Sequence, residues 1–396
     1  MPRPGSDNVV LVTGFPSFLA KKLALYLVTS EPRTTVITLV HPKDLVEARH
    51  AIDALDPHDR SRIQILEGDP CGIDLGLSGV ELRQLAGEVD RIHHAAHVSY
   101  LGTDRKTAEQ MNVVSAAEIV EVAKLSTSLQ CLVLHSTAFV SGDRRGVVYE
   151  EDTSEGVTYR NAIEDTRAHA ERIARRAGKS VPVAIVRPSL VVGDSGTGEI
   201  GRINLPYLFT LLVLAAPIDI ALPIPARGDV PLHFVPIDHV VRAACAIGND
   251  PRAPGRTFHL VDPSPLPVKR YIDLVHHIRE RRASWANVGT LARSVLRTPG
   301  IEGYLRNPKA LVDQLLTSVH YDTRNADMIL APLGIACPPL TSYAEKIIAA
   351  VEERLMGRPA NVEGRMSIPP PPPKPASPTA APNDDPEPSH ETDAMD

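Results

Sequence analysis

The chain has 396 residues, 43% of them hydrophobic but only 4% aromatic, so aliphatic side chains must fill a sizeable core. Its formal net charge of −6 excludes the basic surface typical of nucleic-acid binding. The four cysteines (Cys71, Cys131, Cys245 and Cys337) are scattered, which argues against disulfides and structural zinc and predicts a cytoplasmic protein with reduced thiols and no metal.

Neither the N-terminus nor the most apolar stretch predicts a membrane segment. Residues 1–8 are mostly polar, and the apolar run that follows them is too short for a signal peptide. The stretch 205–224 contains Pro206, Pro217, Asp219 and Pro223, which interrupt it too often for one helix to span a bilayer.

Short apolar runs alternate with helix-like segments in the first half of the chain. Because these runs are apolar at most positions, they are typical of strands covered on both faces. We predict strands at 9–12, 35–40, 62–66, 90–93, 130–135 and 181–186, and helices at 17–29, 43–55, 79–87, 107–124 and 163–177. This order predicts an α/β fold with a doubly wound, Rossmann-type parallel sheet, whose strand carboxyl ends meet at one edge.

The pattern changes after Gly193. Strand character returns at 231–236 and 256–261, and helical character at 269–281, 288–296 and 311–316. We predict a nucleotide-binding core at 1–200 continued by 231–262, a small C-terminal substrate lobe made of 201–230 and 263–356, and a disordered, Pro-rich, acidic tail at 357–396. The proline run 369–373 either binds a partner protein or simply belongs to a solubilising tail.

The first predicted strand and helix are joined by a distinctive turn. It resembles the Thr-Gly-x-x-Gly-x-x-Gly loop of extended short-chain dehydrogenases/reductases, in which the backbone approaches a dinucleotide pyrophosphate at a helix N-terminus. The resemblance implies cofactor contacts from Thr13, Gly14, Pro16, Ser17, Phe18 and Leu19. Here Ser17 and Ala20 replace the second and third glycines, and Pro16 lacks an N–H. We therefore expect binding to be weakened or lost.

The resemblance continues in linear order through roughly residues 8–350. Asp69 matches an aspartate that contacts adenine, Ala95 and Ala96 match a turn along the cofactor, Thr137 matches the catalytic Ser/Thr, and Pro188 and Ser189 match a turn beside the nicotinamide. The chain is most similar to the fatty-acyl-CoA and thioester reductase branch. This likeness implies NADP(H) or NAD(H) as cofactor and an acyl carrier or a small molecule as ligand.

The turn after the second strand bears on cofactor choice. His41 stands where that branch commonly has an arginine for the NADP 2′-phosphate, Lys43 is nearby, and no acidic residue is present to accept ribose hydroxyls. The pattern favours NADP(H), although ordinary solvated surface explains both side chains equally well.

The catalytic dyad of the family is altered. Its members place Tyr-x-x-x-Lys on one face of the helix after the fifth strand, where the phenol exchanges a proton with substrate. Here Ile163 takes the tyrosine position and Arg167 the lysine position, and none of the nine tyrosines has a lysine four residues on. Two substitutes are conceivable: Thr137, and Tyr159, which we place one helical turn before Ile163.

Two functions therefore stay open. The chain is either a pseudoenzyme that binds nucleotide or acyl groups as a scaffold, or an oxidoreductase with an atypical proton donor. The segment 204–217 either forms an acyl groove or packs inside the lobe, with packing slightly favoured. His93, His94 and His97 are close in sequence, but side chains at a strand end point apart, which disfavours a metal site.

Overall fold

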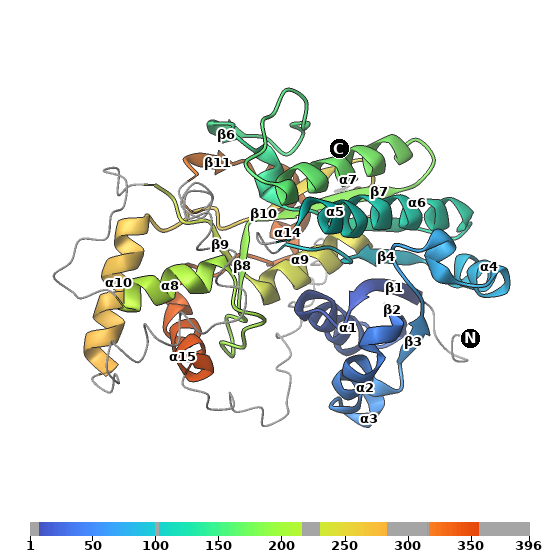
Figure 1. The fold of residues 1–396 in the computed structure, drawn as a ribbon, viewed down its shortest axis with the longest axis horizontal. Coiled ribbons are helices and arrows are strands. Elements are labelled where there is room, and N and C mark those ends of the chain that lie inside the picture. Colours follow the sequence, from blue (N-terminus) through green and yellow to red (C-terminus); the bar gives the residue numbers. More distant parts are fainter. Residues whose placement is uncertain (1–7, 100–102, 216–229, 283–314, 316, 356–396) are drawn as a thin grey trace, which may run out of the picture.

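The computed structural model describes residues 8–99, 103–215, 230–282, 315 and 317–355 (Figure 1). Its central sheet has seven parallel strands in the order β3-β2-β1-β4-β5-β7-β10. The strands are β1 (Asn8–Phe15), β2 (Thr34–Val40), β3 (Ile63–Glu67), β4 (Arg91–His94), β5 (Cys131–His135), β7 (Val183–Pro188) and β10 (Thr257–Leu260). The predicted doubly wound Rossmann-type sheet is confirmed, and its strand order reverses between β1 and β4.

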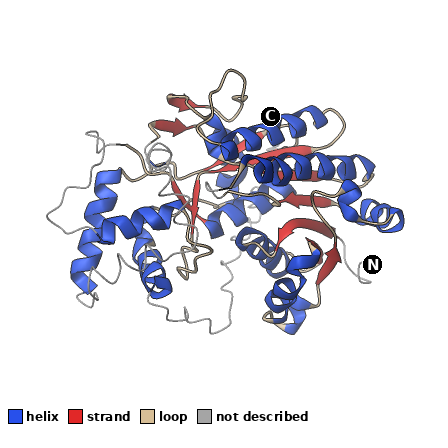
Figure 2. Ribbon diagram, in the orientation of Figure 1, coloured by secondary structure: helices blue, strands red, loops and turns tan. Residues whose placement is uncertain are grey.

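Helices cover both faces of this sheet (Figure 2). One face packs on α4 (Gly79–Glu88), α6 (Ser115–Leu125) and α7 (Ala162–Ala177). The other packs on α1 (Phe18–Ser30), α2 (Leu45–Asp53), α9 (Ile237–Asn249) and α14 (Arg324–Leu330). Strand side chains alternate between the two cores, so Leu11 faces α6 while Val10 faces α1, as expected for a sheet buried on both sides.

Shorter elements complete the core. The predicted helix at 107–124 begins earlier, as α5 (Arg105–Ala108) and a π-helical segment at Glu109–Val114 that leads into α6. The remaining short elements are α3 (Pro57–Arg60), the strand pair β6 (Gly146–Val148) with β11 (Val319–Tyr321), and the pair β8 (Leu190–Val192) with β9 (Phe234–Pro236).

Three helices pack together beside the sheet: α8 (Leu205–Ala215), α10 (Val268–Arg282) and α15 (Ala344–Leu355). Leu208, Leu211 and Leu214 of α8 are buried in this cluster, so packing accounts for most of the apolar segment at 204–217. The predicted helices at 288–296 and 311–316 and the tail at 357–396 lie outside the described residues or almost wholly so. No helix within the described ranges is both long and apolar enough to cross a bilayer.

The turn after β3 has two neighbouring residues in the left-handed region. Asp74 has φ +55° and Leu75 φ +59°, a conformation that costs roughly 1–2 kcal/mol per non-glycine residue. Leu75 is fully buried, and its carbonyl accepts the amide of Asp69 at 2.8 Å. Burial of the leucine therefore offsets the strain, and the strained turn shapes the backbone at Asp69.

Replacing Asp74 by glycine should relieve part of this strain. We expect Asp74→Gly to raise the free energy of unfolding by about 0.5–1 kcal/mol, since the strain relieved exceeds the extra entropy of glycine in the unfolded chain. Asp53→Gly, in the last turn of α2, is the control and should lower it by a similar amount. Urea unfolding compares the two, and equal losses in both variants would contradict the strain at Asp74.

Candidate functional site

The sheet edge gathers the residues that the sequence singles out. Thr13 is in register with His94, His94 with Leu134, and His135 with Val186. The carboxyl ends of β1, β4, β5 and β7 therefore lie side by side (Figure 1). This alignment brings the β1–α1 turn, the turn after β4, the turn after β5 and the Pro188–Ser189 turn to a common edge, as predicted.

The β1–α1 turn requires glycine at its first position. Gly14 has φ +84°, and a Cβ there would lie 2.5 Å from the carbonyl oxygen of Ala95. Thr13 is fully buried; its Oγ1 accepts the amide of Ala96 at 3.1 Å and lies 3.0 Å from Nδ1 of His94. Nε2 of His94 in turn lies 3.2 Å from Oγ of Ser115. The β1–α1 turn is therefore held in place by the hydrogen bond between Thr13 and Ala96 and by the close packing of Gly14 on Ala95.

The start of α1 retains donors for an anion. Ser17 is exposed and caps the helix, its Oγ accepting the amide of Ala20 at 3.4 Å. Its own amide donates to Gly14 at 2.9 Å, and that of Lys21 donates to the Ser17 carbonyl. The amides of Phe18 and Leu19 belong to the first helical turn, which has no intrahelical acceptors, at the positive end of the dipole. Backbone donors of this kind suit an anion such as a pyrophosphate, and their contact with a cofactor stays a prediction.

Residues predicted for the adenosine end follow the neighbouring strands β2 and β3. Asp69 is partly exposed, and its Oδ1 accepts the amide of Cys71 at 2.9 Å. His41 caps a short turn with its Nδ1, which accepts the amide of Lys43 at 3.2 Å, so only Nε2 remains for a ligand. Their contacts with a cofactor stay predictions.

Helix α7 holds the two positions of the altered dyad. Asn161 caps the helix by accepting the amide of Glu164 at 3.0 Å. Ile163 and Arg167 follow on one face, and each is only 6% exposed. Nη2 of Arg167 donates to the carbonyl of Ser136 at 2.9 Å, and burial lowers the pKa of this arginine to about 9. A hydrocarbon thus stands where the sequence comparison leads us to expect the tyrosine, while the guanidinium is hydrogen-bonded to the turn after β5.

The substitutes considered for the missing phenol differ in position. Helix α7 begins at Ala162, so Tyr159 precedes the helix, contrary to our prediction, and its hydroxyl donates to the carbonyl of Ser154 at 3.2 Å. Thr137 is partly exposed and caps the next turn by accepting the amide of Phe139 at 3.4 Å.

One buried phenol near this turn was missed by the sequence reasoning. The hydroxyl of Tyr321 lies 3.2 Å from Oγ of Ser141, in the turn that Thr137 caps. Burial raises the pKa of Tyr321 to about 12, which makes it a weak acid. No sequence signal pointed to it, because it lies 180 residues from Ser141 in the chain.

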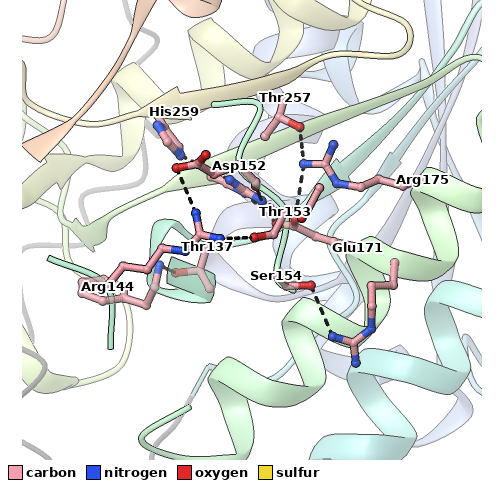
Figure 3. Close-up of polar contacts among 12 residues, drawn as sticks. Thr137, Arg144, Asp152, Thr153, Ser154, Glu171, Arg175, Thr257 and His259 are labelled. Carbon is pink, nitrogen blue, oxygen red and sulfur yellow. Dashed lines mark hydrogen bonds and ion pairs between the residues drawn. The ribbon is translucent and has the colours of Figure 1, made fainter. Parts of the chain in front are cut away.

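A network of buried charges lies beneath the site (Figure 3). Arg187, from β7, donates through Nε and Nη2 to the two carboxylate oxygens of Glu171 at 2.9 and 2.7 Å. Arg175 lies 3.7 Å from the same carboxylate and donates to Oγ1 of Thr257 at 2.7 Å. The partly exposed Arg144 contacts Asp152 at 2.9 Å in the same region. The Arg187 side chain, next to the predicted Pro188–Ser189 turn, is therefore held inside the protein.

Removing the shared carboxylate should be costly. We expect Glu171→Gln to lower the free energy of unfolding by about 3–5 kcal/mol, because it leaves the Arg187 guanidinium buried without a counter-charge. Glu121→Gln is the control: it breaks an exposed pair with Lys124 and should cost less than about 1 kcal/mol. Chemical denaturation measures both, and similar small losses would argue against a tightly coupled pair.

The histidines at the end of β4 are buried and neutral. His93 Nδ1 lies 3.2 Å from His135 Nε2, whereas His94 faces Thr13 and Ser115. Burial lowers the pKa of His93 and of His94 to about 3 each. Within the described ranges, no group of three or more His, Cys, Asp or Glu residues is placed to hold a metal ion.

Comparison with known proteins decides the family. The profile of the family described as male sterility protein, an NAD-binding domain, matches residues 12–244, more than half of the chain. The chain belongs to this family. Its place among the extended short-chain dehydrogenases/reductases, expected from the sequence, is confirmed.

Two kinds of reductase are among the proteins to which this chain is similar. The chain is 26% identical over 299 residues to a carboxylic acid reductase of Mycobacterium tuberculosis, covering 66% of this chain and 25% of that protein. It is 24% identical over 277 residues to the fatty acyl-CoA reductase wat of Drosophila melanogaster, covering 61% and 54%. The chain thus spans between a quarter and about half the length of these relatives.

Solved structures share the fold. The terminal R domain from the myxalamid PKS-NRPS biosynthetic pathway superposes with a TM-score of 0.70 at 21% identity, over 89% of this chain and 92% of that one. A UDP-glucuronic acid 4-epimerase from Bacillus cereus in complex with NAD gives 0.61 at 17% identity, over 89% and 99%.

Proposed function

We propose that this family member binds NADP(H) or NAD(H) but is impaired in hydride transfer, so that it acts as a binding or regulatory scaffold. The observation that carries the proposal is the buried Ile163 at the position of the family's catalytic tyrosine. Four departures coincide, namely Ile163, Arg167, Ser17 and Ala20.

The loss of the phenol is the main chemical argument. A bound nicotinamide supplies hydride, but reduction of a carbonyl also requires a proton at its oxygen. General acid catalysis typically contributes a factor of about 10²–10⁴, and isoleucine has no proton to give. Arg167 keeps a positive charge that could contact ribose hydroxyls, but its Nη2 is engaged by the Ser136 carbonyl and its planar group is not a tunable amine.

The cofactor turn supports binding that is weaker than in family members with three glycines. The amides of Phe18 and Leu19 remain at the α1 N-terminus to bind pyrophosphate, with Asp69 and His41 towards the adenosine. Ser17 places a Cβ and a hydroxyl where the family has hydrogen, and the peptide between Phe15 and Pro16 has no N–H to offer.

The names of the relatives suggest the rest of the ligand. Carboxylic acid reductases, fatty acyl-CoA reductases and a thiolation-reductase di-domain are among the similar proteins. We infer an acyl group as ligand, presented by an acyl-carrier partner or as a small molecule, and a soluble, cytoplasmic protein. The Pro-rich tail is a second candidate site for a protein partner.

Calorimetric titration with NADPH and NADP⁺ tests the proposal. We expect saturable binding by the wild type and binding several-fold tighter by Ser17→Gly, because the glycine removes the obstructing side chain. Gly14→Ala is the matched loss control, since its Cβ would meet the Ala95 carbonyl at 2.5 Å. Undetectable binding at millimolar cofactor by both the wild type and Ser17→Gly would overturn the proposal.

A second function, an NADP(H)-dependent oxidoreductase acting on an acyl thioester or another carbonyl, is favoured by one observation. The partly exposed Thr137 stands at the family's Ser/Thr position, and the turn that it caps ends at Ser141, whose Oγ lies 3.2 Å from the Tyr321 hydroxyl. If Thr137 relays a proton, wild-type turnover is measurable and Thr137→Val abolishes it while cofactor affinity is kept.

A further inference from the structure

A small cavity lies behind Arg167, between the ends of β4 and β5 and helix α7. It has room for about one water-sized molecule. Its wall includes His97, Asn112, His135, Arg167 and Ala170, and no carboxylate is among the residues that line it.

The guanidinium at this wall has no carboxylate of its own. Arg167 is 6% exposed; its Nη2 has the Ser136 carbonyl as acceptor, and its buried Nε has no partner in the described part of the chain. The negative charge of Glu171 attracts the Arg167 guanidinium without a hydrogen bond between them. Both oxygens of that carboxylate accept hydrogen bonds from Arg187, and Arg175 lies 3.7 Å from the same carboxylate. Arg187 thus takes both oxygens of Glu171, and no carboxylate of the described residues is in hydrogen-bond contact with the Arg167 guanidinium beside the cavity.

The other polar atoms at the wall can serve as donors. His135 is 1% exposed, and its Nδ1 has no partner among the described residues, as is also true of Nδ1 of the partly exposed His97. When His93 Nδ1 donates to His135 Nε2, the proton of His135 lies on Nδ1. Asn112 adds no free acceptor, because its oxygen accepts the amide of Val98 and its nitrogen donates to Thr166.

We propose that this cavity binds one anionic atom, held by Arg167 with imidazole N–H groups of His135 and His97. A cation is excluded by the charge, and a water molecule would leave the guanidinium uncompensated. The occupant is either a free halide or one oxygen of a ligand's carboxylate. The inference goes beyond the proposed function and does not depend on whether the α1 turn binds a dinucleotide.

Thermal unfolding in bromide, acetate or sulfate at constant ionic strength tests the site in the full chain. We expect the wild-type Tm to rise saturably by roughly 2–4 °C at tenfold excess over Kd in bromide or acetate, beyond the general salt effect that Arg167→Met shows in the same salts. The rise should disappear in Arg167→Met and persist in Arg176→Met, an exposed arginine on the same helix. A response to bromide alone assigns a halide, and a response to acetate alone assigns a carboxylate oxygen.

Two results would overturn the site: no anion response in the wild type, or the same response in Arg167→Met. Because the methionine variant can fail to fold, anomalous scattering from bromide-soaked wild-type crystals provides an independent readout. A peak within hydrogen-bond distance of the Arg167 guanidinium supports the site, and its absence at saturating bromide contradicts it.

Discussion

The double substitution Ile163→Tyr and Arg167→Lys is expected to raise NADPH consumption with octanal or octanoyl-CoA by about 100-fold or more over the wild type. The two positions are four residues apart on α7, so the new phenol and amine lie on one face beside the edge formed by β5 and β7. The tyrosine then supplies a proton to the substrate oxygen, and the lysine lowers the phenol's pKa.

The matched control for this gain is Ile163→Phe with Arg167→Lys. It has the same ring and the same amine but lacks the hydroxyl. Both variants also lose the hydrogen bond from Arg167 to the Ser136 carbonyl, so this loss does not distinguish them. The phenylalanine variant should stay at the wild-type rate. Equal rates in two folded variants that bind cofactor would mean that the substrate lobe has also diverged.

We expect the protein to unfold at a higher pH than most globular domains when it is acidified. Burial lowers the pKa of seven histidines in the described part of the chain. The pKa is about 3 for His93, His94 and His259, about 4 for His233 and His239, and well below its ordinary value for His97 and His135. Their unfolded pKa lies near 6.5, so the unfolded chain binds more protons between pH 6.5 and 4. Stability is therefore complete above pH 6.5 and falls as the pH decreases through this window.

The change of unfolding free energy with pH can be stated for each residue. Each neutral histidine contributes up to about 1.4 kcal/mol per pH unit to the loss of unfolding free energy. Glu150 has the opposite effect and offsets the contribution of about one histidine. Burial raises the pKa of Glu150 to about 7, so its contribution to stability grows as the pH falls from 7 to 4.5.

Urea unfolding at pH 7.5, 6.5 and 5.5 measures this slope. His239→Gln should reduce the pH dependence by about one proton, whereas His58→Gln, at an exposed position, should leave it unchanged. A flat profile between pH 7.5 and 5.5 would show that the histidines do not stay neutral in the native state.

Sequence patterns predicted the features that depend on local chemistry. The alternation of apolar runs predicted the sheet, and the turn at Gly14 was recognised from its resemblance to the family's glycine loop. The structure gives the physical reason for that glycine, a φ of +84° and a close approach to the Ala95 carbonyl. The start of α7 was set by Asn161, whose cap ends the preceding loop and leaves Tyr159 outside the helix. Helix propensity alone did not show whether Tyr159 lies inside the helix or in the loop before it.

Contacts between distant segments could not be predicted. The partner of Arg167 is a backbone carbonyl in the turn after β5, and the carboxylate that holds Arg187 is on α7. Tyr321 reaches the turn of Thr137 from a strand near the end of the chain. Such pairings arise from the closing of the fold and have no periodic or motif signature in the sequence.

The central claim concerns proton supply, and isotope transfer tests it directly. The wild type is incubated with NADPH carrying deuterium at C4 and with octanoyl-CoA or octanal, at a cofactor concentration shown by calorimetry to saturate the same preparation. We predict no enrichment of deuterium in aldehyde or alcohol above the level without protein. Deuterated product formed by the wild type in repeated turnovers would contradict the account.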